Sequence, residues 1–329
     1  MVLSELALRL NNADYKNWVK AGHCLLLLKR SLEGFVGSQM KSFHRRLLSE
    51  SPVLGRGRQR CTGHCRAQGR QFQPRCSVCA EWKKQILNHH MNRNGEVHWG
   101  NCKPSNFSTN YWELAKAYMP RGQTDKQGPD KCDAAALLNL IHFCTQFKYV
   151  DQRKVQEVIK GRNELMHSSE MKVSSEWLED FGKQIQNVIR EFHDVPDIKA
   201  IGTRIDKVLA SDWDVQIPGD DDVDGLHVIC GISMEEVEME LLREKLQEMY
   251  DLAEEQDILS DKDLISLEKL KNFIKDSKDL KESLAEDLQK LESLEEEMHS
   301  PICSLKEGQQ EDVDPEEEEC VPCKRKCDA

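Results

Sequence analysis

Arginine, amide and histidine side chains lie close together at Arg162, Asn163 and His167. If the segment is helical, Asn163 and His167 share a face, whereas Arg162 continues an apolar stripe that includes Val155 and Met166. A guanidinium can hold a phosphate and stabilise charge that develops on it, and a histidine can exchange a proton with a hydroxyl near neutral pH. Asn163 could orient the histidine or a phosphate oxygen. These residue types in this order point to chemistry on a phosphate ester.

The same positions also fit a purely structural explanation. Arg162 lies where a core residue belongs, so it and His167 could instead form a buried hydrogen-bonded pair that ties two helices together. An Arg followed by a His at this spacing also occurs by chance in many chains. Gly161 costs about 1 kcal/mol relative to alanine inside a helix. It therefore predicts either the close approach of a backbone or a phosphate, or a break in the helix.

The motif and its surroundings resemble two known families. Arg, a polar residue and then His after four to six positions is the pattern of the HEPN family (higher eukaryotes and prokaryotes nucleotide-binding domains). The stretch RNELMHSSEMKVS and the amphipathic helix after it resemble the last two helices of the HEPN variety found in some large vertebrate ubiquitin ligases. Over most of its length the chain also resembles the vertebrate family called chromosome X open reading frame 38, in the stretches WVKAGHCLLLLK, CSVCAEWK and VHWGNC.

The HEPN resemblance implies both a fold and an activity. The fold would be a compact helical bundle that dimerises so that two Arg and His sets meet. The activity would be cleavage of RNA without a metal ion, with Arg162, Asn163 and His167 as the catalytic residues. Many HEPN domains instead serve as inactive interaction modules, so the resemblance also accommodates a non-enzymatic role.

Thirteen cysteines are a large number for a chain of 329 residues. The pair Cys61 and Cys65 is followed, after ten intervening residues, by the pair Cys76 and Cys79. Two such pairs could close a tetrahedral zinc site and give an otherwise coreless loop a reason to fold. Cys76 and Cys79 could instead pack beneath the helix that follows them. Alternative metal ligands nearby are His89, His90, His98 and Cys102.

The cysteine pairs lie in a basic part of the chain. Residues 41–75 contain nine Lys or Arg and one acid, Glu50. We expect residues 51–80 to form an exposed Cys-rich basic loop. Such a loop could follow the phosphates of RNA with strong salt dependence. It could equally be a solvated surface loop, because Phe72 is the only aromatic side chain of residues 51–74 on which a base could stack.

Helical periodicity dominates residues 1–215, which predicts a mainly α fold with a HEPN-like helical bundle. Residues 2–49 should form three core-facing helices that are punctuated by Gly34 and Gly37. Asp133 should cap one later helix, and Asp151 should cap the helix that carries Arg162. After a break containing capping serines, residues 176–192 should form another helix with a continuous apolar seam.

The rear of the chain differs from the front in charge and pattern. Residues 1–234 carry 33 Lys or Arg and 27 Asp or Glu, net +6, and residues 235–329 carry 13 and 31, net −18, which together give −12. A linker is expected at residues 216–234. Leucines and methionines at spacings of three and four then predict a coiled coil at residues 235–299, either as a hairpin or between chains. Residues 300–329 should be an acidic disordered tail.

Two functions remain open on the sequence alone. The first is an RNA- or nucleotide-binding protein that could act as an endoribonuclease. The second is a non-enzymatic scaffold that binds protein partners through its acidic coiled coil and forms homo-oligomers. No glycine-rich phosphate loop, nucleophile elbow or zinc-protease helix is visible, so other enzyme classes have little support. No secretory signal or membrane span is expected, which predicts a cytoplasmic protein; the short basic run at residues 324–326 leaves a nuclear location open.

Overall fold

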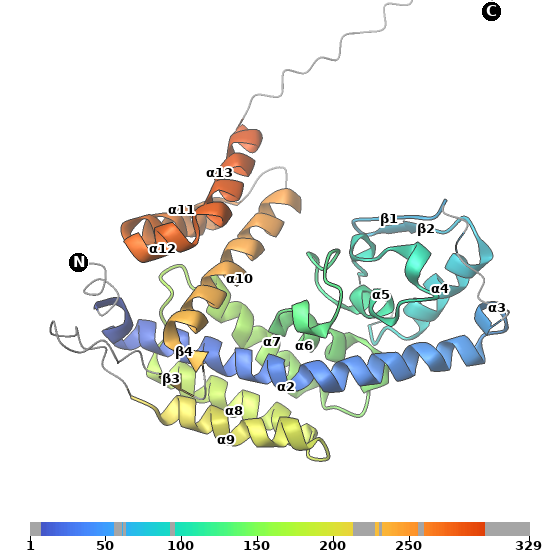
Figure 1. Cartoon of the computed structure of the whole chain (residues 1–329), viewed down its shortest axis with the longest axis horizontal. Helices are drawn as coiled ribbons and strands as arrows, with labels where there is room; N and C mark the ends of the chain where they lie inside the picture. The colour runs from blue at the N-terminus through green and yellow to red at the C-terminus, as the bar shows by residue number, and fades with distance from the viewer. Residues whose placement is uncertain are drawn as a thin grey trace, which may run out of the picture.

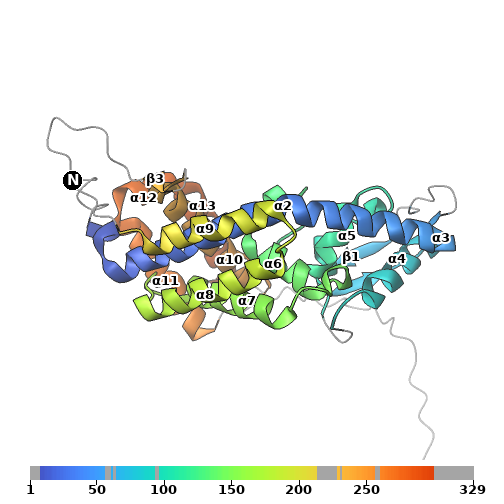
Figure 2. The same cartoon turned by 90° about the horizontal axis from the view of Figure 1, so that it is seen from below.

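The computed structural model describes residues 8–55, 61, 64–92, 96–212, 228–229, 232–255 and 260–299, and these are mainly helical. Helix α2, Ala13–Glu50, is 38 residues long and runs along the molecule as a spine (Figures 1 and 2). The prediction of three helices in this region was wrong, because α2 continues through Gly34 and Gly37. Gly37 packs on Pro129, where an added Cβ would meet Cγ at 3.4 Å. Packing along the whole helix outweighs the cost of about 1 kcal/mol for each glycine.

Four further helices pack into a bundle with the first half of this spine (Figures 1 and 2). The predicted caps are present: Asp133 accepts a hydrogen bond from the amide of Ala136 at 2.7 Å, and Asp151 accepts one from Arg153 at 3.0 Å. None of the described helices is both long enough and apolar enough to cross a membrane. The bundle helices are α6, Ala134–Phe143; α7, Gln152–His167; α8, Ser175–Glu191; and α9, Pro196–Ala210.

Gly161 lies in α7 because α8 approaches at that point. A Cβ at Gly161 would lie 2.4 Å from a ring carbon of Phe181, so any larger residue would require the ring of Phe181 or its helix to shift. The sequence predicted the close approach of a backbone or a phosphate, or a break in the helix. The close contact is made instead by an aromatic side chain, and α7 shows no break.

A smaller lobe, which we call the cysteine lobe (residues 51–132), lies at the C-terminal end of α2 (Figure 1). The predicted basic loop contains more structure than expected, because strands β1, Arg66–Gln68, and β2, Gln71–Gln73, form an antiparallel hairpin. Residues 56–60 and 62–63 of that loop lie outside the described residues. The lobe also contains three short helices: α3, Pro52–Gly55; α4, Ser77–Asn88; and α5, Tyr111–Ala115. Its four 3-10 turns are η1, Trp99–Asn101; η2, Pro104–Asn106; η3, Lys116–Tyr118; and η4, Pro129–Lys131. Outside the lobe, a further turn, η5, Thr145–Phe147, precedes α7.

The interior of the cysteine lobe contains a fully buried ion pair. Lys116 Nζ lies 2.8 Å from Glu113 Oε1, and both side chains are at most 3% exposed. Lys116 also donates to the carbonyl of Thr124 at 2.8 Å, while Glu113 accepts from the amide of Lys103 at 2.7 Å. A buried pair whose remaining hydrogen bonds are satisfied holds loops in one arrangement. The lobe is thus ordered by polar as well as apolar contacts.

The rear of the chain folds back onto the bundle as four helices, which we call the acidic arm. Helix α10 packs along α2, and α13 packs on α10, so the apolar seam predicted for a coiled coil is buried within one chain. The packing is close, since a Cβ at Gly22 of α2 would lie 2.1 Å from Leu241. The helices are α10, Met234–Glu255; α11, Asp261–Asp276; α12, Lys278–Ser283; and α13, Ala285–His299.

Part of the predicted organisation of the rear lies outside the described residues. The structure describes only a short pair of strands from the linker, β3, Val228–Ile229, and β4, Ile232–Ser233, which lead into α10. The predicted tail at residues 300–329 lies entirely outside the described residues.

Candidate functional site

The three residues of the motif lie in the second half of α7 and differ sharply in exposure. The Arg162 side chain is 5% exposed, as expected for a residue that continues the apolar stripe. Asn163 is exposed, and the His167 side chain is 58% exposed. The helix therefore turns the arginine towards the protein interior and the other two residues towards solvent.

Three carboxylates of the chain surround the Arg162 guanidinium. Nη1 donates to Oε2 of Glu248 at 2.8 Å, and Nη2 donates to Oδ2 of Asp133 at 3.3 Å. Oε2 of Glu244 lies 3.8 Å from Nη2. Burial by itself lowers the pKa of Arg162, but the negative charges of Asp133, Glu248 and Glu244 outweigh it, so the pKa is raised overall. The arginine is fully charged and is neutralised by its own chain.

Glu248 links the arginine to the histidine. Its Oε2 accepts from Arg162, and its Oε1 lies 3.8 Å from Nε2 of His167. An arginine and a histidine that acted together on one phosphate would hold that phosphate between them. In this structure the carboxylate of Glu248 lies in that position. The structural alternative was a direct hydrogen bond between Arg162 and His167. In the structure, Glu248 of α10 lies between the two side chains and contacts both.

A lysine fixes this turn of α10 against the end of α7. Lys245 Nζ donates to the carbonyl oxygens of Met166 and of Ser168, the latter at 3.0 Å. These carbonyls belong to the end of α7, where a helix has unpaired acceptors and favours a positive charge. Burial lowers the pKa of Lys245 to about 8. Glu244 and Glu248 flank Lys245 and lie four residues apart, so all three face α7.

The environment of Glu244 changes its pKa. Burial, followed by the nearby charge of Asp133, raises the pKa of Glu244 to about 8. Glu244 therefore keeps its proton to a higher pH than an exposed glutamate does. This limits the electrostatic repulsion among the acids around Arg162.

Two hollows border the motif, one on either side of α10. A groove of about 990 Å³ between α7, α10 and α11 is lined by Met166, His167 and Met249, with Arg153, Lys160 and Lys262 among the charged residues at its walls. A cleft of about 640 Å³ on the other side borders Arg162, Glu244 and Glu248. Asn163 lines both hollows. The motif is thus divided between two surfaces, and α10 lies between them.

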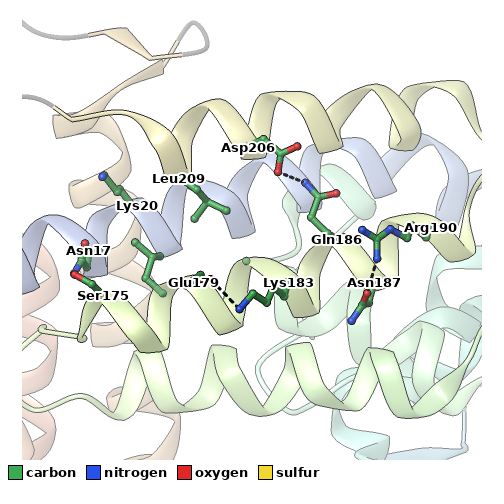
Figure 3. Close-up of a pocket in the computed structure, with 12 residues that line it drawn as sticks. Asn17, Lys20, Ser175, Glu179, Lys183, Gln186, Asn187, Arg190, Asp206 and Leu209 are labelled. Atoms are coloured by element: carbon green, nitrogen blue, oxygen red, sulfur yellow. Dashed lines mark hydrogen bonds and ion pairs between the residues drawn. The ribbon is translucent and has the colours of Figure 1, made fainter.

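A third hollow, of about 600 Å³, lies between α2, α8 and α9 (Figure 3). Several of its polar side chains contact one another: Lys183 lies 2.9 Å from Glu179, and Gln186 donates to Asp206 at 2.8 Å. Figure 3 shows these pairs bridging neighbouring turns and helices along the groove. These side chains therefore have a structural role, since their contacts join turns of α8 and join α8 to α9.

The second candidate site is the group of four cysteines. The Sγ atoms of Cys61, Cys65, Cys76 and Cys79 all lie within 4.8 Å of one another. The Sγ atoms of Cys65 and Cys76 are 3.6 Å apart. Four thiolates on a tetrahedral zinc ion, with Zn–S of about 2.3 Å, would be about 3.8 Å apart. The donor set and its spacing therefore fit a single tetrahedral metal ion.

Local structure explains why the four sulfurs converge. Cys76 is the N-cap of α4, and its sulfur accepts from the amide of Cys79 at 3.4 Å. Cys65 stands just before the hairpin, and its sulfur accepts from the amide of Arg75 at 3.1 Å. Burial raises the pKa of both Cys65 and Cys79, which disfavours thiolates unless a cation is present.

The alternative ligands are used elsewhere or stand apart from the cluster. His89 Nδ1 is 2.8 Å from the hydroxyl of Thr145, and His90 Nδ1 is 2.7 Å from the carbonyl of Asn92. Among the residues that the structure describes, the four-cysteine group contains neither of these histidines, and it also lacks His98 and Cys102.

Sequence reasoning missed the residues of α10 that complete the arginine site. Glu248 is 86 positions away from Arg162, and its spacing marks it only as a polar position of an amphipathic helix. Asp133 was predicted as a cap, and its other oxygen also binds Arg162. The one available signal was that a buried arginine requires acidic partners somewhere in the chain.

Comparison with known proteins places most of the chain in one family. The model of a family described as "Domain of unknown function (DUF4559)" matches residues 9–311. A curated protein of Mus musculus, "Uncharacterized protein CXorf38 homolog", is 55% identical over 304 residues, which cover 89% of this chain and 93% of the mouse protein. No solved structure matches the chain significantly.

Proposed function

We propose that this chain, which belongs to the family of the domain of unknown function DUF4559, is a non-enzymatic helical interaction protein with a structural zinc site. One observation carries the proposal: Glu248 lies between Arg162 and His167, where a substrate phosphate would have to bind. A nuclease needs both side chains available to the same phosphate. Here the arginine is 5% exposed and already bound by carboxylates of its own chain.

The energetics favour a structural role for Arg162. Removing one partner of a buried ion pair costs roughly 3–5 kcal/mol, because an uncompensated charge remains in the interior. A phosphate from solution would have to displace Glu248 and overcome the repulsion of Asp133. Arg162 is best explained as a clasp that joins α7, the start of α6 and α10.

The distribution of charge suggests how such a protein could bring partners together. The cysteine lobe, near the basic part of the sequence, and the acidic arm lie towards opposite ends of α2 (Figure 1). Residues 235–299 carry 9 Lys or Arg and 22 Asp or Glu, net −13. A surface of this sign attracts basic protein segments and repels nucleic acid. We infer that the arm binds a basic protein partner.

Zinc would act as a structural ion in the cysteine lobe. We propose that Cys61, Cys65, Cys76 and Cys79 bind it as thiolates. Four protein ligands complete the tetrahedral coordination of zinc and leave no position for a reactive water, which is typical of structural sites. The ion would join the hairpin segment to the start of α4, and its binding energy would contribute directly to folding of the lobe.

An RNA cleavage comparison tests the non-enzymatic proposal. The full chain and its His167→Ala variant, purified in parallel, are incubated with labelled single-stranded RNA. His167 is largely exposed, so its replacement should leave the fold unchanged. We expect equal, background rates for both proteins. Cleavage by the wild type at ten or more times the rate of the variant would overturn the proposal (a tenfold ratio is about 1.4 kcal/mol).

A further inference from the structure

Solvent reaches the four-cysteine group but not the other cysteines that the structure describes. Cys61, Cys65 and Cys76 are partly exposed. The fourth member of the group is buried, and so are the described cysteines outside it; the buried ones are Cys79, Cys24, Cys102, Cys132 and Cys144. Oxidation of a cysteine requires a thiolate that a dissolved oxidant can reach. Among the described cysteines, the partly exposed members of the group are therefore the first to react.

Cys65 and Cys76 are placed to form a disulfide with each other. Their Sγ atoms are 3.6 Å apart, and a disulfide requires about 2.05 Å, so the sulfurs have to approach by about 1.5 Å. Cys65 immediately precedes β1 and Cys76 follows β2, so the two stand at the open end of the hairpin. A bond between them joins segments that the hairpin already holds side by side. Its formation is thus a local change.

The surroundings of this pair are those of reactive cysteines. Arg66 follows Cys65, Arg75 precedes Cys76, and both arginines are exposed. The amide of Arg75 also donates to the sulfur of Cys65 at 3.1 Å. Reactive cysteines sit in such partly exposed, electropositive surroundings, whereas buried structural cysteines are inert. As zinc ligands both sulfurs are thiolates, which is the form that attacks a peroxide.

We propose that the four-cysteine group is an oxidant-sensitive switch, in which hydrogen peroxide converts Cys65 and Cys76 into a disulfide and the zinc ion is released. The switch rests on the proposed zinc site. One thiolate attacks the peroxide and becomes a sulfenic acid, while the oxygen–oxygen bond breaks and hydroxide leaves. The second thiolate then displaces hydroxide from that sulfur as the S–S bond forms. The two sulfurs lose the two electrons that reduce the peroxide, and two protons from solvent complete two water molecules.

Loss of this pair removes half of the ligands. Cys61 and Cys79 remain, and they are too few for the four-coordinate site of a structural zinc ion. The hairpin itself stays packed, because Phe72 lies against Trp99 with ring centroids 4.9 Å apart. The switch therefore acts on the segment at Cys61, which is no longer joined to the start of α4.

Peroxide treatment of the zinc-loaded full chain tests the switch. Zinc is first counted by native mass spectrometry, and hydrogen peroxide is then added. Released zinc is followed with a chromogenic chelator, and disulfides are located by peptide mapping. We expect about one zinc ion to be released for each disulfide between Cys65 and Cys76. Zinc should bind again after reduction with dithiothreitol, because the disulfide is reversible.

Two substitutions show whether the pair controls the release. Cys65→His keeps a zinc ligand but removes one sulfur of the pair, whereas the matched control Cys61→His leaves the pair intact. We expect peroxide to release zinc from Cys65→His about tenfold more slowly than from the wild type and from Cys61→His, because a sulfenic acid at Cys76 then lacks its facing thiolate. If a histidine variant binds no zinc, the peptide map of the wild type decides.

The outcomes separate the switch from the zinc site. If the zinc-loaded wild type keeps its zinc under peroxide, or if the disulfide joins other cysteines, the switch is wrong and the zinc site stands. Equal release from Cys65→His and Cys61→His also overturns the switch. A wild type that holds no zinc before peroxide is added overturns the zinc site and the switch together.

Discussion

Arg162 shows how a single residue can be predicted in one respect and missed in another. Its place on the apolar stripe of α7 followed from the sequence, which left open both a buried structural position and a catalytic position in contact with a phosphate. Its partners did not, because Glu244 and Glu248 lie more than eighty positions away and nothing local directs them towards α7. Periodicity gives the face of a helix that is buried, whereas the identity of the element that covers this face depends on tertiary packing.

Glu244 gives the arginine site a pH dependence of definite sign. Its pKa is raised from 4.5 to about 8 by burial and by Asp133. The folded chain therefore binds more protons than the unfolded chain, so the stability that Glu244 contributes is full below pH 4.5 and is lost as pH rises through about 8. We expect Glu244→Gln to reduce the fall in unfolding free energy between about pH 5 and pH 8 by at least about 1 kcal/mol.

Urea denaturation of the wild type and the variant across this pH range gives the measurement. Glu282→Gln, on the exposed surface of α12, serves as the control for loss of a carboxylate. If the difference between wild type and Glu244→Gln does not change with pH, Glu244 is ionised in the folded chain and our account of its environment is wrong.

Lys245 of α10 donates hydrogen bonds to the end of α7, and its replacement tests whether these bonds stabilise the chain. Replacement by Met keeps the apolar stem but leaves the carbonyls of Met166 and Ser168 without their buried donor. We expect Lys245→Met to destabilise the chain by roughly 1–3 kcal/mol. Amide hydrogen exchange should rise first in α10. Lys281→Met, on the exposed face of α12, should have no such effect; equal effects of the two substitutions would contradict this role of Lys245.

The four-cysteine site of the cysteine lobe predicts how many zinc ions each molecule binds. Native mass spectrometry of the full chain should show about one zinc ion per molecule. Cys76→Ser should abolish binding, because it removes one of four ligands, whereas Cys132→Ala, at a buried cysteine outside the cluster, should retain the metal. Chelation should lower the thermal stability of the wild type more than that of Cys76→Ser. A metal-free wild-type protein, purified with zinc present, would rule out the site.

Elements with strong local signals were predicted well, and the errors have identifiable causes. The caps at Asp133 and Asp151 and the seam of α8 follow from local sequence. The three helices expected before residue 50 are one helix, since glycine inside a well-packed helix lowers its stability without ending it. The grouping of Cys61, Cys65, Cys76 and Cys79 was predicted from their spacing. The hairpin between the two cysteine pairs was not predicted, because its strands are only three residues long.

At the scale of the whole molecule, the seam of the predicted coiled coil is used inside one chain. Leu242 and Leu246 of α10 and Leu288 and Leu291 of α13 are all buried in a single copy. Self-association stays a prediction of the sequence, and a dimer that used this seam would first have to open the acidic arm. We therefore expect the amide protection of α10 and α13 to be the same at low and high micromolar protein concentration. Protection that increases with concentration would show that the seam is shared between chains.

The central claim is that Arg162 and Glu248 form a clasp within the chain, and a double-mutant cycle measures it most directly. Unfolding free energies are determined for the wild type, Arg162→Met, Glu248→Gln and the double variant. Because the arginine is 5% exposed and the glutamate 28%, we predict a coupling energy of about 1.5–3 kcal/mol. A coupling energy near zero would mean that the two side chains do not interact in the folded protein, and it would contradict the structural role of Arg162.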